Sequence, residues 1–297
     1  MIGAYNHSAI IRKRYPMEHH PLPPPPATVA ANVRAALAED VGDGDVTAKL
    51  VDSGALARAR VISRSAGVFC GAPWIFETCR QIDPEIRLER VAEDGAELTP
   101  EGLLMELSGA ARSLLTAERT ILNFAQLLSG TATRARAYAR AVAGTKSTIL
   151  DTRKTIPGLR AAQKYAAAVG GVRNHRAGLF DAYLIKENHI AAAGGIAPAV
   201  RRARSARPDL VVEVEVEDLD QFGEALRAAP DIVLLDNFSL ERMAEAVRRN
   251  DGHVKLEVSG GVRLEDVYAI ARTGVDYISA GDITKHVEPV DLSMRFG

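Results

Sequence analysis

The second half of the chain alternates between short apolar runs and stretches with helical spacing, and this pattern constrains the fold more than any other feature of the sequence. Strands that alternate with helices in this way are typical of βαβ units in a parallel sheet. The expected strands are 148–150, 182–185, 210–216, 232–235, 254–258 and 275–278. The expected helices between them are 158–169, 194–206, 218–228, 239–249 and 263–272.

Two arrangements of a parallel sheet fit this alternation. A doubly wound dinucleotide-binding fold is the weaker match, because no GxGxxG motif follows the first expected strand. A (β/α) barrel with fewer than eight strands is the stronger match. We therefore expect an α/β protein whose second half is an incomplete (β/α) barrel.

The first half has a different texture and is predicted to be a small α+β sandwich. Strand patterns occur at 56–63, 86–91 and 103–107, and helical patterns at 28–40, 72–82 and 113–143. The last of these helices is expected to break near Ser129 and Gly130. The predicted domains are a Pro-rich tail (1–27), the sandwich (28–130), the barrel (131–284), and a C-terminal segment (285–297) that packs back on the N-terminal domain.

The predicted tail carries basic residues followed by four prolines, not by the apolar segment that a signal peptide requires. We interpret it as disordered, with Met17 as an alternative true start. A docking motif for a proline-binding module remains open.

Composition excludes several classes of protein. The 297 residues include 37 Lys and Arg against 38 Asp and Glu, and this balance argues against a nucleic-acid binder. No apolar stretch approaches the length of a membrane span. The only cysteines, Cys70 and Cys79, cannot form a disulfide framework, so we interpret them as packing residues of a cytoplasmic protein.

Polar residues follow the expected strands. In a parallel barrel the carboxyl ends of the strands and the loops after them form the catalytic face, so these residues are expected to meet at one rim. They are Asp151 to Lys154, Lys186 to His189, Glu215, Asp236 and Asn237, Ser259 to Gly261, and Gly281 and Asp282. In the strand 210–216, Glu213 and Glu215 share one face, and we expect them to face the barrel interior with Lys186 as a partner.

Positive charge is concentrated in one segment. Residues 153–186 contain seven Lys or Arg and one acidic residue, Asp181. We interpret Arg160 and Lys164 as a solvated helix face. The others include strand-end and loop residues, and because like charges converge only where an anion compensates them, they indicate a small polyanionic substrate.

Two further features fit phosphate chemistry. The turns Ser259-Gly260-Gly261 and Ala280-Gly281-Asp282 precede helical patterns and could cradle phosphate through backbone N–H groups. Glu215 and Asp236 offer hard oxygen ligands, which suit Mg²⁺.

Several of these motifs together resemble the quinolinate phosphoribosyltransferase family, the carboxylating nicotinate-nucleotide pyrophosphorylases. The run DTRKTIPGLR at 151–160 is the most specific of them. The others are 44–47, 118–133, 174–176, 184–189, 213–216 and 234–237, and the resemblance spans about residues 28–297.

The resemblance implies a reaction in which quinolinate and phosphoribosyl pyrophosphate give nicotinate mononucleotide, pyrophosphate and CO₂, a step of de novo NAD synthesis. It also implies an N-terminal sandwich, an incomplete barrel, and a homodimer or higher homo-oligomer with shared active sites. Arg119 would then reach the quinolinate pocket of the neighbouring subunit.

The resemblance also implies roles for individual residues. The quinolinate carboxylates would lie among Thr152, Arg153, Lys154, His175, Arg176 and Lys186. Glu215 and Asp236 would act on the ribose hydroxyls and Mg²⁺, and the turns 259–261 and 280–282 would hold phosphate groups. Lys154, Lys186, Glu215 and Asp236 are the expected catalytic residues.

One position departs from the family pattern. Gly170 and Gly171 are followed by Val172, where a third glycine is usual. Two alternatives therefore stay open: a family member that acts on another anionic acceptor, such as the branch associated with molybdenum transport, and a barrel that binds polyanions without catalysis.

Overall fold

The computed structural model describes residues 21–297, and the contacts within it divide this part of the chain into two units. The barrel unit comprises residues 137–154 and 172–282. The sandwich unit comprises residues 21–136, 155–171 and 283–297. The predicted Pro-rich tail lies outside the described residues up to residue 20.

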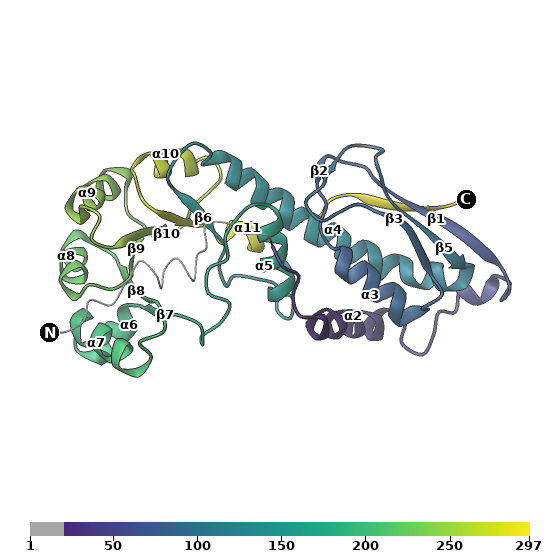
Figure 1. The fold of residues 1–297 in the computed structure, drawn as a ribbon, viewed down its shortest axis with the longest axis horizontal. Helices are drawn as coiled ribbons and strands as arrows, with labels where there is room; N and C mark the ends of the chain where they lie inside the picture. The colour runs from purple at the N-terminus through teal and green to yellow at the C-terminus, as the bar shows by residue number, and fades with distance from the viewer. Residues whose placement is uncertain (1–20) are drawn as a thin grey trace. The chain divides into compact units, whose positions relative to one another are not determined.

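The sandwich unit is built on a four-stranded antiparallel sheet with the order β12-β1-β5-β3. Its strands are β1 (Leu56–Ser63), β3 (Arg87–Val91), β5 (Leu103–Ala110) and β12 (Leu292–Phe296). In β1, buried Ala59 and Val61 alternate with exposed Arg58 and Arg60, as expected of a sheet that is covered on one face. Figure 1 shows α3 (Ala72–Ile82) and α4 (Ala111–Ala141) beside this sheet, and the predicted α+β sandwich is confirmed.

Smaller elements complete this unit. A short antiparallel ribbon joins β2 (Gly67–Val68) to β4 (Glu97–Leu98), and η1 (Ala48–Leu50) is a single 3₁₀ turn. Helix α2 (Pro26–Asp40) begins two residues before the predicted start, because proline is well tolerated in the first turn of a helix.

Helix α4 is continuous, so the predicted break near Ser129 and Gly130 is wrong. The Ser129 hydroxyl accepts a hydrogen bond from the backbone N–H of Cys70 over 3.0 Å. A Cβ atom at Gly130 would collide with the carbonyl oxygen of Glu288. These two residues therefore permit close approach of neighbouring backbone to the helix and do not form a turn.

Helix α5 (Arg160–Val169) corrects a second prediction. Lys164 is only 5 % exposed, so it does not belong to a solvated helix face. Ala162, Ala166 and Tyr165 are buried as well, which means that this helix is covered around most of its circumference.

The barrel unit contains a six-stranded parallel sheet with the order β6-β11-β10-β9-β8-β7. Its strands are β6 (Thr148–Leu150), β7 (Tyr183–Ile185), β8 (Val212–Val216), β9 (Ile232–Asp236), β10 (Lys255–Ser259) and β11 (Tyr277–Ser279). Within the described residues no strand pairing joins β6 to β7, so the sheet is open and the predicted incomplete barrel is confirmed.

Helices connect these strands and flank the sheet (Figure 1). They are α6 (Glu187–Ala193), α7 (Ile196–Ala206), α8 (Leu219–Ala228), α9 (Leu240–Asn250) and α10 (Val267–Arg272), and α11 (Asp282–Lys285) follows β11. Helix α6 was not predicted. None of its residues is buried. A helix without a buried face needs no amphipathic pattern, and such a pattern is the signal from which a helix is predicted.

An apolar cluster fills the interior of the barrel unit near the amino ends of the strands. Ile232 and Tyr277 are the first residues of β9 and β11, and Ala182 and Val211 immediately precede β7 and β8. Leu150, the last residue of β6, completes the cluster from the carboxyl end of its strand. Polar side chains are therefore left to the carboxyl ends of the strands.

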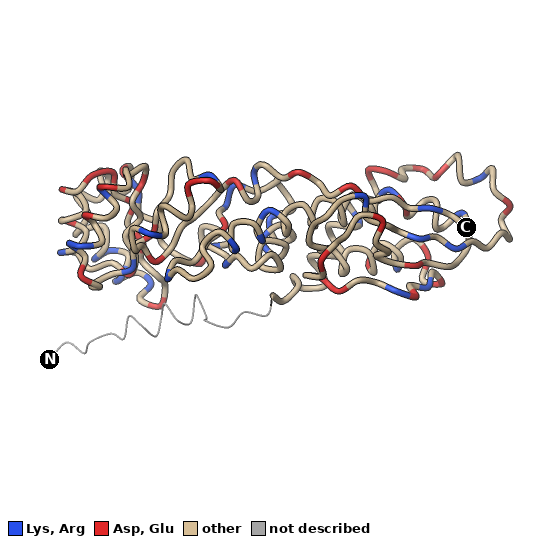
Figure 2. The backbone as a smooth tube through the Cα atoms, turned by 90° about the horizontal axis from the view of Figure 1, so that it is seen from above, with Lys and Arg blue, Asp and Glu red and all other residues tan. Residues whose placement is uncertain are grey.

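Lys and Arg are interspersed with Asp and Glu along both units (Figure 2). Among residues 21–297, no helix combines the length and apolar character that crossing a membrane requires.

Candidate functional site

A pocket of about 370 Å³ lies at the carboxyl ends of the parallel strands in the barrel unit. Ten residues selected from the sequence line it: Thr152, Arg153, Lys154, His175, Arg176, Lys186, Glu215, Asp236, Ser259 and Gly260. Leu184, Leu234, Glu257 and Ser279 complete the lining. The convergence expected for parallel strand ends is therefore present in the structure.

Five of the selected residues are not in this lining. Gly261, Ala280, Gly281 and Asp282 lie outside it, and Arg119 belongs to the sandwich unit. The roles that the family resemblance assigns to these residues stay predictions.

Lys186 and Glu215 form an ion pair at the pocket. Lys186 follows β7 directly, and β7 pairs with β8 so that Ile185 lies opposite Val214. This register places Lys186 beside Glu215, and its Nζ atom donates to Oε2 over 2.5 Å. The expectation that Lys186 partners a glutamate of this strand is thereby confirmed for Glu215.

Glu213 has different partners. Its Oε2 lies 3.2 Å from Nε2 of His175, and Oε1 of Glu257 lies 3.4 Å from the same nitrogen. All three side chains are buried: His175 is 8 % exposed, Glu213 1 % and Glu257 0 %. We refer to these three residues as the His175 cluster.

Burial and mutual charge shift the pKa values in this cluster. Burial and the nearby charge of Glu257 raise the pKa of Glu213 to about 7. Burial lowers the pKa of His175, but the charges of Glu257 and Glu213 outweigh burial and raise that pKa to about 10. The imidazole is therefore electrostatically matched to the carboxylates on β8 and β10.

The loop Asn174-His175-Arg176 is held from a second side by Asp151, which follows β6. Asp151 is fully buried, and its Oδ2 accepts a hydrogen bond from Nδ2 of Asn174 over 2.7 Å. Its Oδ1 accepts from the backbone N–H of His175, also over 2.7 Å. Asp151 therefore supports the pocket wall that carries Arg176.

Gly281 makes room for Lys154, another residue of the pocket wall. A Cβ atom at Gly281 would lie 2.9 Å from Cδ of Lys154, so a glycine here leaves room for the Lys154 stem. The hydroxyl of Thr152 accepts from the backbone N–H of Lys154 over 3.1 Å. Beside them, Oδ2 of Asp282 accepts from the Tyr138 hydroxyl over 2.6 Å.

Asp236 is oriented by the residue that follows it. Nδ2 of Asn237 donates to Oδ2 of Asp236 over 2.8 Å, and the backbone N–H of Asn237 donates to the carbonyl of Ser259 over 3.1 Å. Gly260 has a φ of +90°, and a Cβ atom there would collide with the Asn237 side chain. The glycine is therefore required both by its backbone conformation and by this close approach.

Glu215 and Asp236 fit a magnesium site by the chemistry of their donors. Both present carboxylate oxygens at the pocket, and within each residue one oxygen is engaged by Lys186 or Asn237. Among the described residues, the group whose ligand atoms all lie within 4.8 Å of one another is instead the His175 cluster.

Sequence reasoning missed Glu257 and Ser279. Glu257 lies in the middle of the apolar strand β10, where an unpaired carboxylate would be costly. A carboxylate at such a position was the sequence signal that could have identified Glu257 as a site residue. Ser279 lies at the end of β11 and offered no comparable signal.

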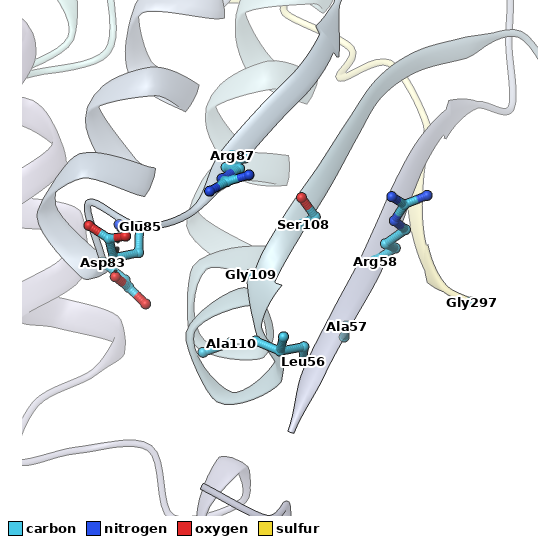
Figure 3. Close-up of a pocket in the computed structure, with 10 residues that line it drawn as sticks. All are labelled: Leu56, Ala57, Arg58, Asp83, Glu85, Arg87, Ser108, Gly109, Ala110 and Gly297. Carbon is cyan, nitrogen blue, oxygen red and sulfur yellow. Dashed lines mark hydrogen bonds between the residues drawn. The ribbon is translucent and has the colours of Figure 1, made fainter. Parts of the chain in front are cut away.

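Neither of two larger hollows combines the cations of the pocket with Glu215 and Asp236. One, of about 640 Å³, lies along β7 and α7 and shares Arg153, Arg176 and Lys186 with the pocket. The other, of about 730 Å³, lies in the sandwich unit. There Arg58 and Arg87 both align with Ser108 across the sheet (Figure 3), but carboxylates from Asp83 and Glu85 line the same hollow.

Two domain families match the sequence. Residues 45–129 match the N-terminal domain of quinolinate phosphoribosyl transferase, and residues 131–295 match its C-terminal domain. The chain belongs to the quinolinate phosphoribosyltransferase family. The resemblance that the sequence motifs indicated is thereby confirmed.

Individual family members are similar over nearly their whole length. The nicotinate-nucleotide pyrophosphorylase (carboxylating) of Mycobacterium leprae is 44% identical over 270 residues, which cover 88% of this chain and 95% of the relative. Quinolinate phosphoribosyltransferase (decarboxylating) 1b of Nicotiana tabacum is 36% identical and matches 89% of this chain and 81% of its own. A solved nicotinate-nucleotide pyrophosphorylase from Francisella tularensis has 48% identity and a TM-score of 0.90, covering 92% of this chain and 97% of that protein.

Proposed function

We propose that this family member transfers the phosphoribosyl group of phosphoribosyl pyrophosphate to quinolinate with loss of CO₂. The products are nicotinate mononucleotide, pyrophosphate and CO₂, and the step belongs to de novo NAD biosynthesis. One observation carries the proposal: the pocket brings Arg153, Lys154, Arg176 and Lys186 together with Glu215 and Asp236. The names of the similar proteins support the same reaction.

The cationic residues suit an acceptor with two adjacent carboxylates. Guanidinium groups of Arg153 and Arg176 present planar forks that match carboxylate geometry, and the ammonium groups of Lys154 and Lys186 act as point charges. These charges reduce the repulsion between quinolinate and phosphoribosyl pyrophosphate, which are both polyanions. Holding the two substrates together then supplies a large part of the rate acceleration.

The carboxylates suit the sugar that is transferred. When pyrophosphate leaves, positive charge develops at C1 of the ribose, and Glu215 and Asp236 stabilise that charge through space. The pyridine nitrogen of quinolinate attacks C1, so the protein needs no nucleophile of its own. The ring nitrogen becomes cationic in this step, which makes loss of the neighbouring carboxylate as CO₂ easier.

Magnesium is part of this proposal, with Glu215 and Asp236 as the residues that would hold it. An ion held there would supply positive charge against the negative charge of the departing pyrophosphate. Lys186 sets the orientation of Glu215, and Asn237 sets the orientation of Asp236. Ser259 and Gly260 line the same side of the pocket and are proposed to hold phosphate through backbone N–H groups.

We further propose that the active form is a homodimer or a higher homo-oligomer that shares its active sites. Arg119 would enter the pocket of a second copy of the chain, as the family resemblance implies. A cytoplasmic location is supported by Cys70 and Cys79, which are buried free thiols.

One assay tests the reaction. Purified protein is incubated with quinolinate, phosphoribosyl pyrophosphate and Mg²⁺, and nicotinate mononucleotide, pyrophosphate and CO₂ are quantified in equal amounts. Nicotinate in place of quinolinate serves as a matched control for the second carboxylate. Tight quinolinate binding without product would indicate the non-catalytic polyanion binder, and product from another anionic acceptor alone would indicate the molybdenum-associated branch.

A further inference from the structure

We infer that Glu257 is a positioning residue of this site: beside Glu213, its charge holds the Nε2 edge of the His175 ring in place, and through His175 it fixes the loop that carries Arg176. The inference deepens the proposed function, and its effect on substrate rests on that function. Glu257 itself belongs to none of the motifs that identify the family in this sequence.

The His175 ring faces two carboxylates through one of its nitrogens. Nε2 of His175 lies 3.2 Å from Oε2 of Glu213 and 3.4 Å from Oε1 of Glu257. These carboxylates come from β8 and β10, on either side of β9 in the sheet. One imidazole nitrogen therefore faces carboxylates from two different strands.

The hydrogen bond to the Arg176 backbone shows which nitrogen of His175 carries the imidazole proton. Nδ1 of His175 accepts the backbone N–H of Arg176 over 2.7 Å. An accepting nitrogen carries no proton, so in the neutral ring the proton is on Nε2, where it points at the carboxylates. The charges of Glu213 and Glu257 favour a second ring proton and the Arg176 N–H opposes one on Nδ1, so Nε2 keeps its proton in either state.

Burial of these two carboxylates reduces the stability of the fold. Neither oxygen of Glu257 makes a hydrogen bond, so its Oε1 attracts Nε2 of His175 by charge across 3.4 Å, and Oε1 of Glu213 is likewise buried without a hydrogen-bond partner. Two buried carboxylates with three such oxygens are expensive, and apolar side chains of similar size would stabilise a barrel interior better. Fold stability therefore does not explain why a glutamate occupies position 257, whereas a role in holding His175 does.

The His175 cluster is in direct contact with the substrate pocket. His175 and Glu257 both line the pocket, and the His175 ring bonds the main chain of Arg176, whose side chain lines it too. Together with Asp151, which accepts from the backbone of His175, the cluster ties this loop to strands β6, β8 and β10. Loss of Glu257 is therefore expected to weaken quinolinate binding and to leave the pyrophosphate side largely intact.

The same three side chains could also hold a metal ion, because their ligand atoms lie within 4.8 Å of one another. A metal on Nε2 would move the imidazole proton to Nδ1, where it would oppose the Arg176 N–H. The observed hydrogen bond therefore favours the proton-bearing Nε2.

The kinetic test compares Glu257→Gln, Glu257→Leu and Val258→Ala. Val258 is buried on the opposite face of β10, so its truncation is a matched control for lost stability without contact to His175. Loss of a charged acceptor is expected to raise the quinolinate KM by roughly tenfold or more in Glu257→Leu. Glu257→Gln keeps an acceptor oxygen and is expected to lie between Glu257→Leu and the wild type.

The same series is expected to leave the KM for phosphoribosyl pyrophosphate within about twofold of the wild type, since that substrate uses other residues. Equal loss in Val258→Ala, or unchanged quinolinate KM in both Glu257 variants, would overturn the inference.

Two ligand-free measurements separate this inference from the proposed function. Nitrogen-15 NMR of labelled histidine is expected to show His175 protonated on Nε2, and hydrogen exchange at the Arg176 amide is expected to accelerate in Glu257→Leu but not in Val258→Ala. An unprotonated Nε2 would refute the inference, and so would unchanged hydrogen exchange at Arg176. It would also be refuted by a stoichiometric zinc or manganese ion that the wild type retains and Glu257→Gln loses. A wild type that forms no nicotinate mononucleotide but shows the expected NMR and exchange behaviour would refute the proposed function alone.

Discussion

The ammonium of Lys186 and the carboxylate of Glu215 meet over 2.5 Å at the carboxyl ends of two neighbouring parallel strands. Glu215 is the more enclosed partner, with 10 % of its side chain exposed against 43 % for Lys186. The pair lies where the cationic part of the pocket meets its acidic part. Its geometry therefore affects both proposed substrates.

A double-mutant cycle on this pair tests that coupling. Lys186→Met and Glu215→Gln are each expected to lower kcat/KM, and the double variant is expected to lose less than the two single effects combined. Residues in direct contact show coupling energies of about 0.5–3 kcal/mol. A partly exposed pair contributes at most about 1 kcal/mol to folding, so urea unfolding of all three variants should change little. Strictly additive losses in kcat/KM would show that the two residues act independently.

Arg153 and Arg176 are expected to dominate quinolinate binding. Arg153→Ala or Arg176→Ala removes a bidentate, charge-assisted partner of a carboxylate, and affinity measured by calorimetry should fall by about tenfold or more. Arg202→Ala is the matched control, because Arg202 carries the same charge but lies outside the lining of the 370 Å³ pocket. Equal affinity in all three variants would contradict the assignment of this pocket to quinolinate.

The convergence of the candidate site residues on one pocket was largely predictable from the sequence, and the reason is geometric. Residues such as Lys154, Lys186 and Asp236 follow apolar runs, and parallel strands bring their carboxyl ends together whatever the details of packing. Glu257 could not be assigned in this way, because its meaning depends on His175, which reaches it only through the folded loop.

The fold was predictable where the hydrophobic periodicity was strong, but not where tertiary contacts determine the local structure. Ser129 and Gly130 have the composition of a turn, yet they lie inside α4 because neighbouring backbone approaches the helix there. Lys164 has the character of a surface residue, yet helix α5 is covered around most of its circumference. In both cases tertiary packing overrides local preference.

Arg119 provides a test of the proposed shared active site. An Arg119→Ala chain lacks a residue that would be supplied to the partner, and a Lys154→Ala chain lacks one in its own barrel pocket. A heterodimer of the two variants would contain one intact site, so each heterodimer should have about half of the wild-type activity, and an equal mixture that reassembles at random should recover about a quarter. Inactive heterodimers, verified by differential tags, would argue that Arg119 acts within its own subunit or not at all.

Magnesium dependence tests the role given to Glu215 and Asp236. Excess chelator is expected to abolish turnover, and added Mg²⁺ should restore it. Asp236→Asn, which keeps the shape of the side chain but removes its charge, should raise the Mg²⁺ concentration needed for half-maximal activity. Full turnover in chelator, or an unchanged Mg²⁺ requirement in Asp236→Asn, would count against the proposed site.

Gly130 provides a test of the fold that does not depend on the reaction. Alanine normally stabilises a helix interior relative to glycine by about 0.5–1 kcal/mol, and Gly223→Ala in helix α8 should follow this rule because the nearest atom to its added Cβ, 3.8 Å away, belongs to the flexible Arg227 side chain. Gly130→Ala should do the opposite, since its Cβ would collide with the Glu288 carbonyl. Overpacking of this kind costs about 1–3 kcal/mol, so urea unfolding should show a lower free energy of unfolding for Gly130→Ala and an equal or higher one for Gly223→Ala. If both variants were stabilised, the segment around Glu288 would not lie against α4, and the continuous helix would need another explanation for its glycine.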